Sequence, residues 1–303
     1  MIAPTPPRTV PEREKLHKEA ARRWTKLGRE HPELVETIAF GRGVVALYID
    51  ELPQAATVAL TPERAREKLA AGIPLLEDED IDLDLPGIRR FFTLLCDLAT
   101  GRPELATAAA RLQAALRSHE TLPDELLAAA LAGDADALEA AAADLAIEVT
   151  ALRTLTSFTV SAAFLGVARA LAPLATAANL PLWEVPSCPV CGGPPLLAEL
   201  QGSSGERKLR CAICGTGWRI LVNRCAHCGT EDQQMLHYLA KEGQEGKYRV
   251  DLCDRCHGYL ASFTSFAVTP PELLTIEDAA LLSLGAAARA RGYTATPDIA
   301  PHE

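Results

Sequence analysis

Aromatic residues are scarce in this chain of 303 residues, where Phe, Trp and Tyr together make up 5%. Positive charge is also in short supply, with 30 Lys and Arg against 40 Asp and Glu and a net charge of −10. A chain with this balance has little attraction for a phosphate backbone, so we expect no nucleic-acid partner. Apolar residues still reach 48%, which excludes a disordered chain and indicates a true hydrophobic core.

Targeting and catalytic motifs are missing as well. Residues 1–8 contain no apolar run, so no secretory signal is expected. The most apolar stretch, residues 155–178, is interrupted by Arg169 and rich in small residues, which predicts a core helix and no membrane insertion. The chain has no Walker A loop, His-Glu-x-x-His helix, Gly-x-Ser-x-Gly elbow or dinucleotide fingerprint. These absences predict that the protein is not an enzyme.

Cysteine, by contrast, is concentrated in one region. Eight of the nine cysteines form four Cys-x-x-Cys pairs, called knuckles 1 to 4 below. In chain order they are Cys188/Cys191, Cys211/Cys214, Cys225/Cys228 and Cys253/Cys256. This spacing is typical of metal-binding knuckles, and four knuckles supply the ligands of two complete tetrathiolate sites. Sequential pairing, 1 with 2 and 3 with 4, closes the shortest loops and is favoured over a cross-braced arrangement.

Each knuckle also has the local chemistry of a metal-binding turn. Two intervening residues allow both sulfurs to reach one ion, and main-chain N–H groups can then donate hydrogen bonds to the thiolates. The residue after the second cysteine often needs positive φ, which favours glycine. That position holds Gly192, Gly215, Gly229 and His257 in the four knuckles.

Other interpretations of these cysteines are weaker. Thioredoxin-like chemistry needs a Cys-x-x-Cys where a strand meets a helix, and these pairs lie among short β-like segments and glycines. Knuckle 4 with His257 matches a c-type haem attachment sequence, but the other knuckles lack the histidine. His227 and His257 can each replace a thiolate, although eight cysteines already saturate two sites. Cys96 lies on an apolar helix and is expected to be a buried hydrophobic residue.

Composition divides the chain into regions. Alanine and leucine dominate its first part, and apolar residues recur there at helical spacing, which predicts an all-helical domain over residues 1–182. The spacing is clearest in Leu16, Ala20, Trp24 and Leu27. Two small β modules of rubredoxin-like or zinc-ribbon type are predicted over 183–222 and 223–270. Along the chain, each module contains a knuckle, a β-hairpin, a second knuckle and then an aromatic residue. Bound metal would compensate for their small cores. A C-terminal helix and tail follow over 271–303, so the predicted fold is multidomain.

Three further segments carry weaker signals. The acidic run 77–84 is interpreted as a solvated loop, or alternatively as a site that attracts a basic segment of a partner. Residues 183–270 contain nine Lys or Arg and nine Asp or Glu, so thiolate-bound metal would make this region acidic. The tail beyond Gly292 is expected to fray.

The chain resembles the formate dehydrogenase accessory protein family, FdhE. The matching pattern begins with Trp-x-x-Pro-x-Cys-Pro-x-Cys-Gly, from Trp183 to Gly192, and continues through three further knuckles in the same order. Trp218-Arg219 after knuckle 2 and Gly258-Tyr259-Leu260 after knuckle 4 also match. Over the first 180 residues or so, only the helical character and the length agree.

The resemblance implies a cytoplasmic accessory protein, not an enzyme, that is needed to mature respiratory formate dehydrogenases. Such a protein would bind the immature catalytic subunit before its export. The resemblance also implies two rubredoxin-like modules with an iron ion at each cysteine set. Spacing alone does not distinguish iron from zinc, so zinc is the alternative. Two rival functions remain open, a zinc-ribbon adaptor of another complex and a dithiol or sulfur-transfer enzyme.

Overall fold

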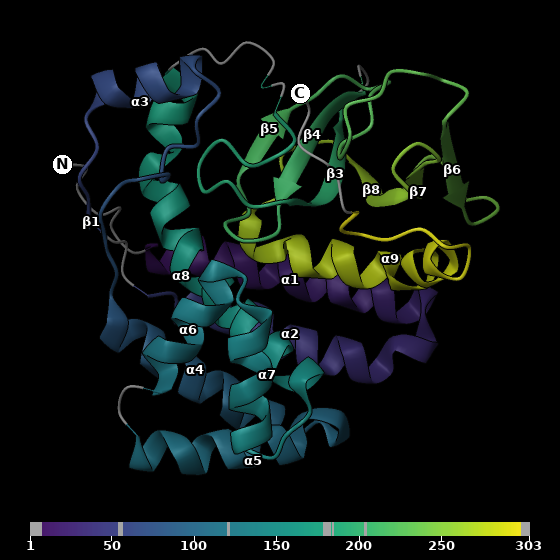
Figure 1. Cartoon of the computed structure of the whole chain (residues 1–303). Coiled ribbons are helices and arrows are strands. Elements are labelled where there is room, and N and C mark those ends of the chain that lie inside the picture. The colour runs from purple at the N-terminus through teal and green to yellow at the C-terminus, as the bar shows by residue number, and fades with distance from the viewer. Residues whose placement is uncertain are drawn as a thin grey trace. The chain divides into compact units, whose positions relative to one another are not determined.

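The computed structural model describes residues 8–53, 57–119, 122–177, 183, 185–202 and 205–297 (Figure 1). The chain forms two compact units. The first consists of Met1–Val58 and Ile81–Ala170, and the second of Ala59–Asp80 and Leu171–Glu303. The predicted boundary at residue 182 falls outside the described residues, and the divisions at 222 and 270 stay predictions.

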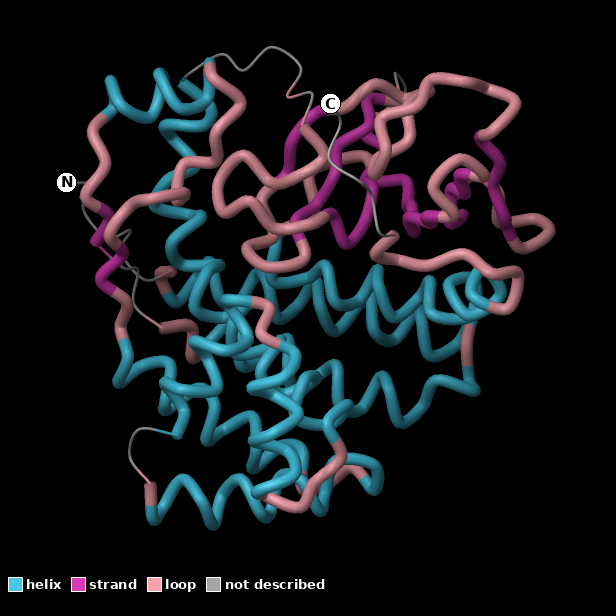
Figure 2. Tube along the Cα trace, viewed as in Figure 1, coloured by secondary structure: helices cyan, strands magenta, loops and turns pink. Residues whose placement is uncertain are grey.

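Helices make up nearly all of the first unit, as the alanine- and leucine-rich composition predicted (Figure 2). They are α1 (Val10–Glu30), α2 (Val35–Asp50), α4 (Leu85–Ala99), α5 (Pro103–Ser118), α6 (Leu122–Ala132), α7 (Ala135–Asp144) and most of α8 (Val149–Ala177). A short 3-10 turn, η1 (Pro32–Leu34), and the two-residue strands β1 (Thr57–Val58) and β2 (Ile81–Asp82) complete the unit.

Helix α1 shows how local sequence sets the helix ends. Thr9 and Glu12 form a capping box, in which the Thr9 N–H donates to the Glu12 carboxylate at 2.8 Å. The four apolar residues that predicted this helix, from Leu16 to Leu27, are all buried. The helix ends at Glu30, with His31 as its C-cap, because Pro32 cannot continue it. The predicted start at Thr61-Pro62 is also confirmed, since α3 (Pro62–Ala70) has Thr61 as its cap.

The core of the first unit is built around α4. Phe91, Phe92, Leu95 and Cys96 lie on one face of this helix and are buried. Tyr48 of α2 stacks on Phe91 with ring centroids 5.7 Å apart. Burial raises the pKa of the Cys96 thiol to about 12, so it remains protonated. The interpretation of Cys96 as a buried hydrophobic residue is therefore confirmed.

Helix α8 contains the most apolar stretch of the chain. By length and composition alone, Val149–Leu174 could cross a membrane. However, 72% of this apolar window is buried inside the protein. This is the behaviour of a core helix, as the sequence predicted.

One six-stranded sheet carries the cysteine region of the second unit. Its order is β5-β4-β3-β8-β7-β6, formed from β3 (Pro195–Gln201), β4 (Glu206–Cys211), β5 (Gly217–Arg219), β6 (Leu236–Ala240), β7 (Tyr248–Cys253) and β8 (Gly258–Ser265). Each half is an antiparallel three-stranded set that contains two knuckles, which confirms the predicted repeat. The halves join through parallel pairing of β3 with β8, from Leu197↔Ala261 to Gln201↔Ser265. The sequence did not predict this junction, because a parallel pair has no connecting turn to read.

A C-terminal helix packs against the sheet, also as predicted. After the 3-10 turn η2 (Pro271–Leu273), α9 (Leu274–Arg289) contacts β7 and β8. Tyr248 of β7 donates to the Glu277 carboxylate at 3.0 Å, and Arg289 donates to the hydroxyl of Tyr259 at 2.7 Å. These bonds fix α9 along one face of the second half of the sheet.

Candidate metal centres

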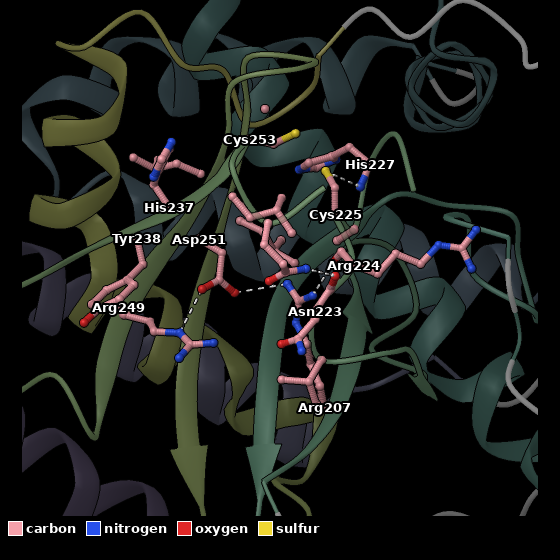
Figure 3. A pocket seen from close by; sticks show the side chains of 17 residues that line it. Arg207, Asn223, Arg224, Cys225, His227, His237, Tyr238, Arg249, Asp251 and Cys253 are labelled. Atoms are coloured by element: carbon pink, nitrogen blue, oxygen red, sulfur yellow. Dashed lines mark hydrogen bonds and ion pairs between the residues drawn. The ribbon is translucent and has the colours of Figure 1, made fainter. Parts of the chain in front are cut away.

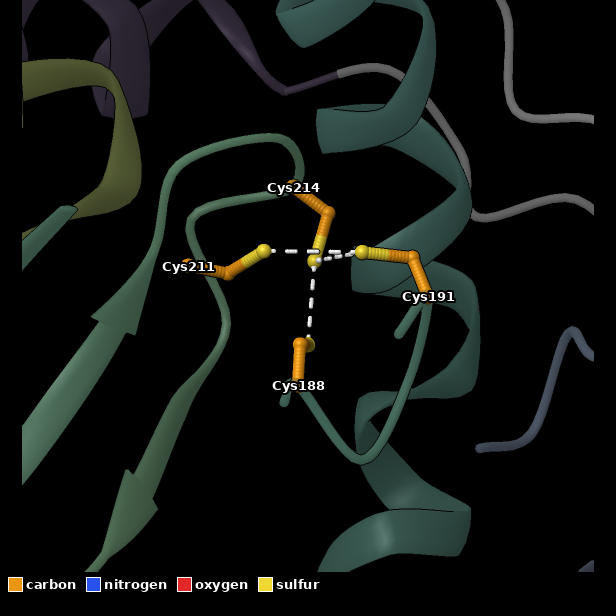
Figure 4. Close-up of side chains that lie close together, drawn as sticks. All are labelled: Cys188, Cys191, Cys211 and Cys214. Carbon is orange, nitrogen blue, oxygen red and sulfur yellow. Dashed lines mark hydrogen bonds between the residues drawn. The ribbon is translucent and has the colours of Figure 1, made fainter. Parts of the chain in front are cut away.

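The eight paired cysteines converge into two groups of four. The first site contains Cys188, Cys191, Cys211 and Cys214, and the second contains Cys225, Cys228, Cys253 and Cys256. Within each group the sulfurs lie within 4.8 Å of one another. Figure 4 shows the four side chains of the first site pointing toward a common centre from two separate turns. The structure therefore has the sequential pairing, 1 with 2 and 3 with 4.

The sulfur spacings fit tetrahedral coordination. In the first site the Sγ atom of Cys191 lies 3.4 Å from the Sγ atom of Cys211 and 3.5 Å from that of Cys214. In the second site Cys228 and Cys253 are 3.7 Å apart. Four sulfurs held about 2.3 Å from one ion lie about 3.8 Å from each other, whereas a disulfide bond is about 2.05 Å long. The donor set thus fits one metal ion per site.

The knuckle turns have the geometry that the sequence predicted. Main-chain N–H groups point at the first sulfur of three knuckles, from Val190 to Cys188 at 3.4 Å, from Ile213 to Cys211 at 3.3 Å and from His227 to Cys225 at 3.4 Å. The residue after the second cysteine has positive φ in all four knuckles. The values are +74° at Gly192, +66° at Gly215, +67° at Gly229 and +53° at His257.

Knuckles 2 and 3 share a longer motif that the cysteine spacing alone did not reveal. Both read Arg-Cys-Ala-x-Cys-Gly-Thr, over residues 210–216 and 224–230. Arg210 donates to the Gly215 carbonyl from Nε at 3.3 Å and from Nη2 at 3.1 Å. Arg224 makes the same contact with Gly229 at 3.1 Å from Nε. The repeated heptapeptide was the available signal, and it marks each arginine as a clamp that closes its knuckle.

The knuckle 2 clamp is anchored inside the sheet. Arg210 and Glu199 are 2% and 0% exposed, and their ion pair measures 2.5 Å. Burial by itself raises the pKa of Glu199. The charge of Arg210 and hydrogen bonds from Ser265 and Thr269 outweigh this, so the pKa of Glu199 is lowered overall. Arg210 thereby links the first site to the centre of the sheet.

A segment remote in sequence braces the first site. The N–H groups of Leu75 and Leu76 donate to the carbonyls of Pro189 and Val190, both at 2.9 Å. These carbonyls belong to the two residues between the cysteines of knuckle 1. The segment follows α3, which explains why residues 59–80 belong to the second unit.

The acidic run that follows this segment is more structured than the sequence suggested. Glu79 forms an ion pair of 2.8 Å with Lys68, whose side chain is only 3% exposed. Asp84 accepts a hydrogen bond from the Gly87 N–H at 3.0 Å and caps α4. For these two acidic residues, the prediction of a solvated loop is wrong.

The C-terminal segment braces the second site in the same way. Thr294 pairs with Gly258, and its N–H donates to the His257 carbonyl at 2.8 Å. The Tyr259 N–H donates to the Thr294 carbonyl at 2.8 Å, and the Tyr293 hydroxyl donates to Asp254. The expectation that the tail frays beyond Gly292 is therefore wrong for Tyr293 and Thr294, while residues 298–303 lie outside the described residues.

The electrostatics of the first site favour a bound cation. Burial raises the pKa of Cys188 and of Cys214, whereas hydrogen bonds from the neighbouring thiols, that of Cys188 first, lower the pKa of Cys211. Thiols this close cannot all ionise beside one another without a compensating positive charge. A divalent or trivalent ion supplies that charge and displaces the protons.

The second site shows the same competition. A hydrogen bond from Cys256 is the main cause that lowers the pKa of Cys225 to about 4, while burial raises the pKa of Cys253 to about 11. Neither neighbouring histidine joins the group of sulfurs. His227 is buried and its Nε2 lies 3.0 Å from the Tyr259 carbonyl oxygen, and His257 contacts Tyr293 with ring centroids 6.1 Å apart.

Fold and site together define a class of protein: a helical region followed by a β-rich, zinc-ribbon-like region with two four-cysteine sites and a C-terminal helix. No protein-family model matches the chain. Among curated proteins, it is similar to the FdhE homolog of Shewanella baltica strain OS223, with 31% identity over 121 residues. That match covers 38% of this chain and 39% of the relative. The FdhE protein of Escherichia coli O127:H6 is 30% identical over 109 residues, covering 35% and 34%.

The solved structures extend the similarity along the chain. The crystal structure of the FdhE protein from Pseudomonas aeruginosa matches with a TM-score of 0.59 and 24% identity over 92% of both chains. At that identity the match establishes the shared fold. The chain matches only about two fifths of the length of the curated relatives. Together these findings confirm the resemblance to the FdhE family that the knuckles and their flanks predicted.

Proposed function

We propose that each four-cysteine site binds one metal ion and that all eight knuckle cysteines are ligands. The convergence of the sulfurs at tetrahedral spacing supports this proposal. Iron is the expected metal, by resemblance to the FdhE family, and zinc is the alternative, because both ions accept four thiolates in this geometry. When bound, the ions would hold the knuckles together and stabilise the small hydrophobic cores beside them.

We further propose that the protein is a cytoplasmic accessory factor for maturation of formate dehydrogenase that binds the immature catalytic subunit. The observation that carries this proposal is the fold shared with an FdhE protein over 92% of the chain, together with the curated FdhE relatives. In this role the metal-stabilised sheet would act as a rigid recognition surface. Four thiolates saturate a tetrahedral ion and leave no position for substrate or water, which supports a non-enzymatic role.

Co-purification tests the role. The full chain is expected to retain the catalytic subunit of formate dehydrogenase from a cytoplasmic extract, since recognition precedes export. The variant Cys225→Ser/Cys253→Ser is expected to lose it, because the second half of the sheet loses its ion. Cys96→Ala is the matched control, since this cysteine lies outside both sites.

The two rival functions predict different results. Colourless protein with two zinc ions and no retained dehydrogenase would favour a zinc-ribbon adaptor of another complex. Metal-free protein with reactive thiols would favour a dithiol or sulfur-transfer enzyme.

A further inference from the structure

A pocket lies beside the second site and contains several charges that the metal site does not use. Its volume is about 160 Å³, and it is lined by β4, β6, β7 and the loop 222–227 (Figure 3). Side chains alternate between the two faces of a strand. Tyr248 of β7 contacts α9, so its neighbours Arg249 and Asp251 face the opposite side of the sheet, where the pocket opens.

One carboxylate in the pocket serves two guanidinium groups. Asp251 forms ion pairs with Arg249 at 2.8 Å and with Arg207 at 3.0 Å, and it accepts a hydrogen bond from Ser262 at 2.7 Å. Both carboxylate oxygens are therefore occupied. The buried Nε of Arg207 has no hydrogen-bond partner among the described residues. Arg207 and Arg249 bring two positive charges against the one negative charge of Asp251, so these side chains give the pocket an excess of positive charge before the thiolates of the second site are counted.

The negative thiolates of the second site balance only part of the positive charge of these arginines. Burial lowers the pKa of Arg207, and the negative charges of Asp251 and of Cys225, which lines the pocket, oppose that effect only in part. Arg249 lies four positions before Cys253 on an extended strand, a Cα separation of about 13 Å. Its guanidinium instead lies 5.8 Å from the centre of the Tyr238 ring, at the rim of the pocket. Arg249 is thus positioned to meet a group that enters from outside.

The rim of the pocket is the edge strand of the sheet. β6 pairs only with β7 among the described residues, so the main-chain groups on its outer side are available to another strand. Tyr238 on β6 is 59% exposed, and Met235 just before it is 39% exposed. An extended segment that pairs with β6 would bury these side chains and place alternate residues near the pocket.

We propose that this pocket binds the carboxylate side chain of an extended, acidic protein segment that adds to the sheet at β6. Arginine binds planar carboxylates through two parallel N–H groups, which suits this ligand better than a neutral side chain. The inference rests on the proposed role in binding another protein, but it assigns the surface and the chemistry independently of which protein supplies the segment.

Synthetic probes test the assignment on the full, metal-loaded chain. The probes are acetate and two short peptides of alternating threonine and valine that differ only in a central glutamate or glutamine. The glutamate peptide is expected to bind at least about tenfold more tightly than its glutamine counterpart. Arg249→Gln should remove that preference. The control Arg219→Gln should keep it, because this exposed arginine of β5 pairs with Glu206 of β4, and neither residue lines the pocket.

The binding results distinguish an acidic protein segment from the other roles that these arginines could have. The metal-to-protein ratio is measured for each variant to show that it has folded. Equal binding of both peptides, or binding of neither, overturns the proposal and leaves the arginines as counter-charges for the thiolates. A third outcome is that acetate perturbs Arg249 more than sodium chloride does, while the protein shows no preference between the two peptides. This result would overturn the proposal of a protein segment and would favour a small carboxylate as the ligand. Because no dehydrogenase is used, each of these results is independent of the co-purification test.

Discussion

The main-chain N–H of Leu75 donates a 2.9 Å hydrogen bond to the carbonyl of Pro189, inside the first knuckle. A matching bond joins Thr294 to His257 at the fourth knuckle. Knuckle 1 is thus held by a segment that is remote in sequence, and knuckle 4 is held by the C-terminal segment. Knuckles 2 and 3 are instead closed by their own arginines. The two sites therefore depend on separate supports, which can be removed one at a time.

Leu75→Pro removes the N–H that braces knuckle 1. The loss leaves a main-chain acceptor unpaired and should cost about 1–3 kcal/mol, with faster release of metal from the first site to a chelator. Leu75→Ala is the control, because both variants lose the same buried side chain and only proline loses the donor. Release is best followed in a Cys225→Ser/Cys253→Ser background, where only the first site is filled. Equal release from the proline and alanine variants would show that the brace has no role.

Thr294→Pro should have the corresponding effect on the second site alone. It removes the N–H bound to the His257 carbonyl, whereas Thr294→Ala keeps that donor. In a Cys188→Ser/Cys211→Ser background, the proline variant is expected to release metal several-fold faster than the alanine variant. If the same substitution also speeds release from the first site, the independence of the two supports is contradicted.

The buried pair of Arg210 and Glu199 predicts a dependence of stability on pH. The pKa of Glu199 is lowered below its ordinary 4.5 in the folded protein, so its contribution is fully present above about pH 4.5. The contribution is lost as the pH falls further, through the pKa of the folded state. The difference in unfolding free energy between the protein and Glu199→Gln should therefore shrink on acidification below pH 4.5. A difference that does not change with pH would argue against an ionised Glu199.

Removing the arginine alone should be more damaging than removing the carboxylate. Arg210→Met leaves Glu199 as an unpaired buried charge, which should cost about 3–5 kcal/mol. The double variant Arg210→Met/Glu199→Gln should recover the part of that loss that comes from the unpaired charge, while the part that comes from the broken contacts with Gly215 remains. Denaturant unfolding of the metal-loaded protein measures both effects, and a double variant as unstable as the single one would contradict the pairing.

Two of the four positive-φ positions in the knuckles, Gly192 and His257, predict different responses to substitution. Gly192→Ala meets only an ordinary contact, 3.6 Å from Pro74, so its cost is the left-handed backbone alone, about 1 kcal/mol. His257→Gly relieves the same strain at +53° but loosens the unfolded chain, so the free energy of unfolding should change little. Thermal unfolding distinguishes the two variants. A large loss in His257→Gly would mean that the histidine side chain contributes through its contact with Tyr293.

The sequence predicted those features that depend on local chemistry. Helix α1 followed from the spacing of Leu16, Ala20, Trp24 and Leu27 and from the proline after His31. The grouping of the cysteines followed from loop length, and the positive φ at His257 followed from its place in a knuckle. In each case the residues that decide the structure are close together in the chain.

The features that sequence reasoning missed depend on contacts between distant segments. Nothing near Leu75 indicates that its N–H will meet Pro189, and nothing near Leu197 indicates parallel pairing with Ala261. The pocket at Arg249 is equally non-local, because it combines residues from β4, β6 and β7. Only the Arg-Cys-Ala-x-Cys-Gly-Thr repeat was available in the sequence itself.

Metal content per chain tests the central claim most directly. Anaerobically purified protein is expected to contain two ions per chain, with the visible absorption of ferric tetrathiolate if the metal is iron and none if it is zinc. Cys188→Ser and Cys253→Ser should each lower the content by one ion, whereas Cys96→Ala should leave it at two. Protein that contains no metal, or whose content is unchanged in both serine variants, would contradict the account.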